Sequence, residues 1–195
     1  NRDLERARGI DYNLSFSDTV DIGVPIDLQW NLVVNRNLER SLTYTNPDGT
    51  VDYESYEGEW GFSEWRAQSG LVLAWDKWRF NLQTYYLGAV GQDPEAVDEF
   101  SDAFTFSDTC LGPPTDVLCR DYAEADSYMI HSASLFYNED NWSLGMGIRN
   151  LEDKAPPLAD PSEINGVKAR AIGYGYDLMG RSFFLSASYN FDIGL

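Results

Sequence analysis

The sequence of 195 residues has few of the residue types that mark several protein classes. Its single histidine excludes a multi-histidine metal site, and its two cysteines are too few for a small disulfide-framework protein. Lys and Arg number only 14 against 32 Asp and Glu, and the net charge of −18 argues against a nucleic-acid partner. No apolar run approaches the roughly 18 residues of a transmembrane helix. A β-sheet protein remains open, and a membrane is not excluded, because strands that cross a bilayer alternate apolar and polar residues.

Aromatic residues make up 14% of the chain, which excludes a disordered acidic tail. The length is that of one domain, and there is no repeat, low-complexity tract or linker. The sequence begins at Asn1 without an initiator Met or an apolar signal region. We therefore expect either a processed chain or a piece of a longer one.

Alternation of apolar and polar residues is the dominant pattern. It occurs in seven segments, at 9–17, 25–35, 65–75, 78–90, 126–137, 142–150 and 182–191. A period of two places each apolar set on one face of a strand. Globular strands are commonly about 5–6 residues long, whereas a strand that crosses a bilayer needs about 9–11. The pattern therefore predicts seven strands that are long enough to cross a bilayer.

The connections between these segments alternate in length. The short ones lie at about 18–24, 76–77 and 138–141, and the long ones at about 46–64, 91–125 and 151–180. Short turns at one end and long loops at the other are typical of outer-membrane barrels. Half of the acidic residues lie in 46–64 and 91–127, which contain only one basic residue. We interpret these two acidic loops either as a solvated surface or as a mouth that attracts cations.

Two motifs near the C-terminus carry a resemblance to a known family. Residues 150–157 read Asn-Leu-Glu-Asp-Lys-Ala-Pro-Pro, and residues 176–184 read Tyr-Asp-Leu-Met-Gly-Arg-Ser-Phe-Phe. In this order they resemble the end of TonB-dependent outer-membrane receptors, where similar motifs follow the penultimate strand and open the last one. Segments 127–137 and 65–88 are also similar to strands of that family.

The sequence departs from the family pattern in two places. Glu152 stands where the family usually has an aromatic residue. The chain also continues past Phe191 with four more residues, whereas the family usually stops at the aromatic. The second departure affects how the barrel-assembly machinery would read the end of the chain.

The resemblance implies an all-β fold, an antiparallel up-and-down transmembrane β-barrel of 22 strands. Residues 1–195 would be its C-terminal part, with the last seven strands and without the plug domain and the TonB-contacting segment. Seven strands cannot themselves form such a barrel, because single-chain barrels have an even number of strands, eight or more. Open edges in hydrocarbon would also leave backbone groups unpaired. We therefore expect a sequential meander whose first and last strands do not pair with each other.

The resemblance also implies a function, which is active uptake of a scarce nutrient across the outer membrane of a Gram-negative bacterium with energy from TonB. Siderophore, cobalamin and saccharide are all open as the nutrient. Outer-membrane lipid, lipopolysaccharide and, through the missing N-terminal region, the TonB complex are the implied partners. We expect no enzyme activity and no cofactor. The alternatives are a soluble saccharide-binding β-sandwich, which leaves the loop sorting unexplained, and an outer-membrane hydrolase, for which no catalytic constellation is found.

The long acidic loops contain the candidate site residues. Five of them, Tyr53, Tyr56, Glu57, Glu59 and Trp60, combine aromatic faces with carboxylates in segment 46–64, which suits a saccharide or an organic cation. Folding of the loop on itself and contact with lipid headgroups are the open alternatives. A calcium site at the alternating acidic residues of 48–54 is disfavoured, because the EF-hand spacing is absent.

Cys110 and Cys119 lie in the longest loop. An oxidising compartment would favour a disulfide between them. Closing a loop of about ten residues should stabilise the fold by roughly 2.5–3 kcal/mol. A metal site would need further Cys or His ligands, so none is expected.

The strands predict a division of faces and an aromatic girdle. Residues expected to face lipid are Ile10, Tyr12, Leu14, Leu28, Trp30, Leu32, Leu185, Tyr189 and Phe191. Residues expected to face the lumen are Asp27, Gln29, Asn31, Arg79, Asn81, Gln83, Ser186 and Ser188. Trp75, Trp78 and Trp142 flank the short turns and are interpreted as a headgroup-level girdle. His131 is expected to be a structural polar residue, and Gly173, Gly175 and Gly180 do not form a dinucleotide motif.

Overall fold

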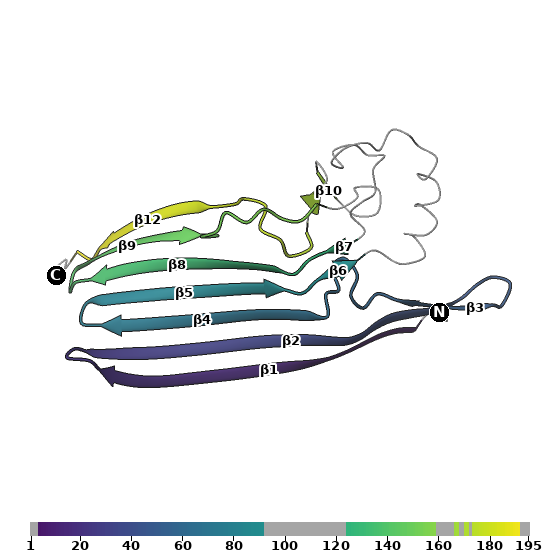
Figure 1. The fold of residues 1–195 in the computed structure, drawn as a ribbon, viewed down its shortest axis with the longest axis horizontal. Helices are drawn as coiled ribbons and strands as arrows, with labels where there is room; N and C mark the ends of the chain where they lie inside the picture. The colour runs from purple at the N-terminus through teal and green to yellow at the C-terminus, as the bar shows by residue number, and fades with distance from the viewer. Residues whose placement is uncertain (1–3, 92–123, 159–165, 168–169, 172, 192–195) are drawn as a thin grey trace.

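The computed structural model describes residues 4–91, 124–158, 166–167, 170–171 and 173–191. Its main feature is one antiparallel sheet with the order β1-β2-β4-β5-β8-β9-β12 (Figure 1). These strands are β1 (Leu4–Asp21), β2 (Pro25–Thr45), β4 (Trp65–Trp75), β5 (Trp78–Leu87), β8 (Tyr128–Asn138), β9 (Trp142–Arg149) and β12 (Ser182–Tyr189). The short strands are β3 (Val51–Ser55), β6 (Val90–Gly91), β7 (Glu124–Ala125), β10 (Gly166–Val167) and β11 (Arg170–Ala171). No helix in the described part of the chain is long and apolar enough to span a membrane.

The seven long strands follow one another in chain order, as the alternation predicts. Their short turns, at 22–24, 76–77 and 139–141, all lie at the left end of the sheet in Figure 1, and the long connections lie at the right end. Among the described residues, β1 pairs only with β2 and β12 pairs only with β9. The sheet is therefore open, and the predicted pairing of both end strands on one side only is confirmed.

The first two strands are longer than the predicted segments 9–17 and 25–35. A β-bulge between Arg8 and Gly9 breaks the two-residue period, so the extension beyond it is not visible as alternation. Beyond this bulge the two strands are joined by ion pairs from Arg8 Nε to Glu39 Oε2, at 2.5 Å, and from Arg40 to Glu5. Segment 46–64, predicted to be a loop, contains β3, which folds back on β2 as a hairpin.

The register gives the sheet an apolar face and a polar face. Residues on the apolar face include Ile10, Tyr12, Leu14, Phe16, Leu28, Trp30, Leu32, Leu71, Leu73, Phe80, Leu82, Leu135, Met146, Ile148, Leu185 and Tyr189. Residues on the polar face include Ser15, Asp27, Gln29, Asn31, Arg79, Asn81, Gln83, Ser132, Ser134, Arg149, Ser186 and Ser188. Phe191, which follows β12, packs on Tyr189 with ring centroids 4.7 Å apart. The predicted separation of the two sets onto opposite faces is confirmed.

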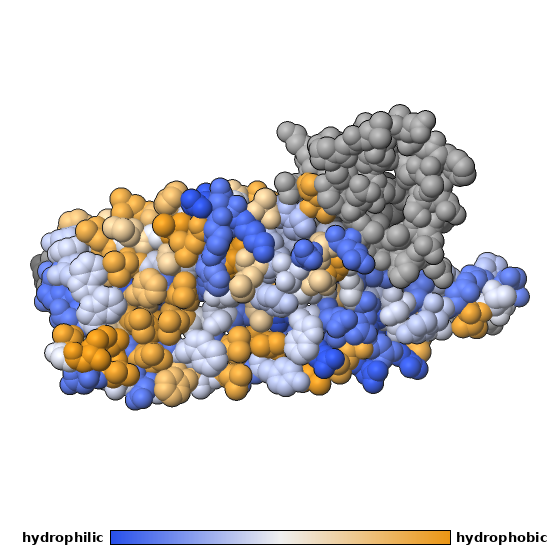
Figure 2. All heavy atoms as spheres, viewed as in Figure 1, coloured by the Kyte–Doolittle hydropathy of each residue, from blue (hydrophilic) through white to orange (hydrophobic). Residues whose placement is uncertain are grey.

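The apolar face is left bare. Leu14 is 54% exposed and Leu185 is 78% exposed. Figure 2 shows apolar side chains gathered toward the short-turn end and hydrophilic ones gathered toward β3. On β2 the apolar positions run from Ile26 to Val34, which is about 26 Å at about 3.3 Å per residue. The apolar band of a transmembrane barrel is about 25 Å tall.

A small core lies at the other end of the molecule. It consists of Trp60, Leu87, Val90, Ala125, Tyr128 and Tyr176. Leu87 and Tyr128 pair across β5 and β8 on the polar face, whereas Trp60 and Tyr176 come from two long connections. These connections therefore fold over the polar face near the long-loop end, and the apolar face does not share in this core.

Candidate functional site

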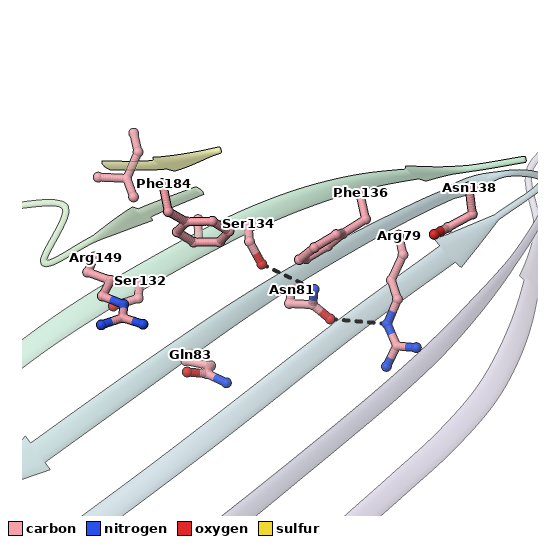
Figure 3. A pocket seen from close by; sticks show the side chains of 11 residues that line it. Arg79, Asn81, Gln83, Ser132, Ser134, Phe136, Asn138, Arg149 and Phe184 are labelled. Carbon is pink, nitrogen blue, oxygen red and sulfur yellow. Dashed lines mark hydrogen bonds between the residues drawn. The ribbon is translucent and has the colours of Figure 1, made fainter. Parts of the chain in front are cut away.

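A groove of about 600 Å³ lies on the polar face over β5, β8, β9 and β12. Figure 3 shows Arg79 and Arg149 at its two ends, with the rings of Phe136 and Phe184 between them. The amides of Asn81 and Gln83 and the hydroxyls of Ser132 and Ser134 supply most of the remaining polar lining. All of these side chains belong to neighbouring strands, because the register sets them on one face.

Glycines allow the two rings to lie against the sheet. A Cβ atom at Gly145 would lie 2.4 Å from Cδ1 of Phe136, and one at Gly147 would lie 2.3 Å from Cε1 of Phe184. The ring centroids are 6.5 Å apart and the planes are tilted by 41°. Because each ring rests on bare backbone, the glycines of β9 create a shallow aromatic floor in an otherwise polar groove.

The groove contains cationic groups but no carboxylate in its lining. Arg79 Nε donates to Asn81 Oδ1 at 3.3 Å, and Asn81 Nδ2 donates to Ser134 Oγ at 3.2 Å. Arg149 has no ion pair with the described part of the chain. Two guanidinium groups without an ion pair in the described ranges form an anion-attracting wall, although the chain as a whole carries a charge of −18.

The long connections pack together at the long-loop end of the sheet, and the residues of their core do not line this groove. The Trp60 ring meets Tyr174 at 6.1 Å and Tyr176 at 6.0 Å between centroids, and Tyr176 meets Tyr128 at 5.2 Å. Trp60 is also held through its backbone, since its N–H donates to the carbonyl of Gly91. Burial raises the pKa of Tyr176 to about 12.

The structure does not bring the five predicted loop residues together as one surface. Trp60 is only 6% exposed, with both neighbouring rings against it, whereas Tyr53 on β3 is 62% exposed. Tyr56 donates a hydrogen bond to Glu54, which raises the tyrosine pKa to about 12, and its ring lies 5.9 Å from Phe62.

The two remaining members of that set are acidic. Glu57 is exposed, and Glu59 forms an isolated bridge with Gly91 through its backbone. A ligand-binding role for Tyr53, Tyr56, Glu57, Glu59 and Trp60 stays a prediction.

Hydrogen bonds join the two C-terminal motifs, at 150–157 and 176–184, to each other. Asn150 is fully buried, and its Nδ2 donates to Asp177 Oδ2 at 3.0 Å and to the Lys154 carbonyl at 2.9 Å. Its Oδ1 accepts the Lys154 N–H at 2.8 Å. In return, Asp153 Oδ1 accepts the Arg181 N–H at 2.8 Å. The motifs at 150–157 and 176–184 therefore join the end of β9 to the start of β12.

Aromatic side chains flank the apolar band at its short-turn end. Trp78 packs on Tyr137 at 4.8 Å, Tyr137 packs on Trp142 at 5.4 Å, and Trp75 pairs with Trp78 across β4 and β5. We call Trp75, Trp78, Tyr137 and Trp142 the turn-end girdle. The position predicted for the three tryptophans, beside the short turns on the apolar face, agrees with the register.

A second row of aromatic residues, which sequence reasoning missed, lies at the long-loop end of the band. Tyr12, Trp65 and Tyr86 are on the apolar face by register, and the Arg36 guanidinium lies 4.9 Å from the centroid of Trp65. The alternation contains these positions, but only pairing across four strands shows that they share one level.

Polar groups within the apolar band bond to one another. Trp30 Nε1 donates to Ser69 Oγ at 2.9 Å, and Thr84 Oγ1 is joined to His131 Nδ1 at 2.8 Å. His131 also lies 3.8 Å from Glu152, the residue that replaces an aromatic in the family pattern. These contacts give His131 a structural environment and pair the polar atoms of Trp30, Ser69 and Thr84 on the band.

An ion pair joins two of the short turns. Lys77 Nζ lies 2.5 Å from Glu139 Oε2. The hydrogen bond to Glu139 raises the pKa of Lys77, and the hydrogen bonds from Lys77 and Tyr137 lower the pKa of Glu139.

Two predictions concern metals and sulfur chemistry. No group of three or more potential metal ligands occurs within the described ranges. Cys110 and Cys119 lie outside the described residues, so their disulfide stays a prediction.

Of the groove residues, Arg79, Asn81 and Gln83 are on the predicted lumen face, but Arg149, Phe136 and Phe184 were missed. Phe184 interrupts the polar side of its segment, and that interruption was the available signal. Scans against protein-family models, curated proteins and solved structures find no match for this chain.

Proposed function

We propose that this chain is the C-terminal part of the β-barrel of a TonB-dependent outer-membrane receptor, which takes up a scarce nutrient such as a siderophore, cobalamin or a saccharide. Its strands would form part of the barrel wall, with the apolar face in lipid and the polar face toward the lumen. The missing edges would be completed by further strands of the same receptor, and the TonB complex would act through its plug region.

The observation that carries the proposal is the bare apolar band between two aromatic rows. Barrels that cross the outer membrane have such a band, with aromatic girdles at both interfaces. The band length on β2 supports a bilayer crossing, and the pairing of Trp30 with Ser69 matches the need to satisfy polar groups in hydrocarbon. The sorting of short turns and long loops adds independent support.

The soluble saccharide-binding β-sandwich needs a second sheet to cover the apolar face. Apart from the large sheet, the described residues form only two two-stranded sheets, at β6–β7 and β10–β11. Leu185, at 78% exposure, would face water in such a protein. The receptor is therefore the better account of the observed surface.

Membrane placement is tested with two single-tryptophan versions of the receptor that contains this chain, in phosphatidylcholine vesicles that carry bromine near the middle of the acyl chains. The first keeps only Trp30, which lies on the apolar face, and the second keeps only Trp60, which lies in the loop core. We expect strong quenching of Trp30 fluorescence and weak quenching of Trp60. Equal quenching of both, or none, would contradict a lipid-facing band.

Transport is tested in cells that make the receptor. Deletion of residues 142–191 removes β9 and β12, and energy-dependent accumulation of one labelled nutrient should be lost. Ferric siderophore, cobalamin and oligosaccharide are each followed with and without an uncoupler of the proton gradient. Unchanged accumulation of every energy-dependent substrate would contradict the transport function.

A further inference from the structure

The groove on the polar face combines three recognition elements that the receptor proposal does not explain. It has two guanidinium groups, a set of neutral amides and hydroxyls, and an aromatic floor. We propose that this groove binds an acidic oligosaccharide, that is, a chain of sugar rings that carry carboxylates. The inference rests on the proposed function, since it names the class of nutrient.

The charge distribution selects an anionic ligand. The groove lining has Arg79 and Arg149 and no Asp or Glu. Arg149 has no ion pair within the described ranges, so its planar fork is available for bidentate bonds to a carboxylate. A cationic solute would be repelled by these two groups, and a neutral solute would accept hydrogen bonds from them without an ion pair.

The neutral residues select a ligand that is rich in hydroxyl groups. Gln83 offers an amide donor and acceptor, and Ser132 and Ser134 offer hydroxyls, all along one side of the groove (Figure 3). Such groups exchange hydrogen bonds with sugar hydroxyls without adding charge. Phosphate or a simple carboxylate would use the arginines but would leave most of these groups to water.

The aromatic floor selects the ring form of the ligand. Because Gly145 and Gly147 have no side chain, the rings of Phe136 and Phe184 lie close over the backbone there and line the groove. The C–H face of a pyranose ring packs on such a surface, whereas a flexible acidic peptide has no equivalent flat apolar face. Phe184 remains 38% exposed, which leaves area for this contact.

The spacing of the arginines selects a short oligosaccharide over a single sugar. By register the two residues are two strands and four positions apart, which places their Cα atoms about 16 Å from each other at about 4.8 Å per strand and 3.3 Å per residue. Both guanidinium groups extend into the groove between these points. One linked chain of sugar rings reaches both ends.

The test measures binding of trigalacturonate and of neutral maltotriose to the receptor that contains this chain, in detergent micelles, by isothermal titration calorimetry. We expect trigalacturonate to bind at least about tenfold more tightly than maltotriose, with the difference shrinking as salt screens the arginines. Arg149→Gln and Arg79→Gln should each weaken trigalacturonate binding by about tenfold or more. Arg6→Gln, at the far end of β1, is the matched control and should leave binding within about twofold.

Equal affinity for the two trisaccharides would overturn the inference, as would unchanged binding in both groove variants. Each variant is first checked for an unchanged circular dichroism spectrum, and Arg149→Lys provides a second variant that keeps the charge but loses the fork. If Trp30 is quenched by brominated lipid and trigalacturonate does not bind, the inference fails and the receptor proposal stands. If Trp30 is not quenched, the receptor proposal fails whatever the binding result.

Discussion

Replacement of Leu71 by Arg tests most directly whether the apolar face lies in lipid. Leu71 is on β4, an interior strand of the sheet, and its cross-strand neighbours on the same face are Trp30 and Leu82. No acidic residue lies opposite it to accept the new charge. An arginine near the middle of a bilayer costs about 2–4 kcal/mol in a transmembrane barrel. We therefore expect Leu71→Arg to lower the free energy of unfolding in vesicles by about 2–4 kcal/mol.

The next residue along the strand is a matched control. Val72 points to the opposite face, where Gln29 and Asn81 are its neighbours. Val72→Arg also exchanges an aliphatic side chain for a guanidinium on the same strand, but it does so on the polar face. We expect it to change the free energy of unfolding by no more than about 0.5 kcal/mol, as for an ordinary surface substitution.

Leu28 is a third position at which an arginine tests the size of the expected loss in the free energy of unfolding. It is also on the apolar face, but it lies nearer the short turns, and Asp18 is its cross-strand neighbour. Directly opposite residues have Cβ atoms about 4.5–5.5 Å apart, so an arginine at 28 would reach this carboxylate. Leu28→Arg should therefore cost less than Leu71→Arg, and the addition of Asp18→Asn should raise its cost.

The measurement is a urea titration of the receptor that contains this chain, in phosphatidylcholine vesicles, followed by tryptophan fluorescence. Each variant is compared with the unmodified chain under the same conditions, because the difference is more reliable than either absolute value. If Leu71→Arg and Val72→Arg change the free energy of unfolding equally, the two faces do not have different surroundings. That result would refute the assignment of the apolar band to lipid.

Three further predictions concern the loops and turns. Asn150→Ala should lower the free energy of unfolding by about 1–3 kcal/mol for the hydrogen-bond partners left unpaired and by about 1–2 kcal/mol for its backbone at φ 52°. Asn150→Gly in the same urea titration removes only the hydrogen bonds and so separates these two costs. No change in either variant would contradict a stabilising role for the hydrogen bonds between the two motifs. The Lys77–Glu139 pair should protect the neighbouring turn amides from hydrogen exchange between pH 4.5 and 10.5, the ordinary pKa values. Because the folded-state pKa of Glu139 is lowered, this residue loses its contribution as pH falls below that range. Because the folded-state pKa of Lys77 is raised, this residue loses its contribution as pH rises above that range. Equal protection in Glu139→Gln would disprove that the ion pair protects the turn. Cys110 and Cys119 should resist alkylation in the folded, unreduced chain, and modification of both thiols would exclude their disulfide.

The strands were predictable because alternation is a local signal. Trp65–Trp75 and Trp78–Leu87 match the predicted segments closely, since each is bounded by a two-residue turn. The face of each side chain follows from its parity alone. The long extension of β1 was missed, because charged residues and the bulge at Arg8 interrupt the period, and its stability comes from ion pairs to β2.

The candidate site was less predictable because it depends on which strands lie side by side and in what register. Arg79 and Arg149 come together only after β5, β8 and β9 are paired. The position of Trp60 is similarly hidden, because its partners Tyr174 and Tyr176 are more than a hundred residues away in the chain. No pattern within one segment of the sequence predicts the contact of Trp60 with these two tyrosines.

Register connects the apolar band, the groove and the two C-terminal motifs. A slip of one residue between β9 and β12 would move every side chain of β12 to the other face, so that Leu185 would leave the apolar face. Phe184 fits only over Gly147, because a side chain there would collide with the ring. The bond between Asn150 and Asp177 sets the same register from the loop end. The motif residues therefore act through alignment, and their removal should disturb the apolar face and the groove together.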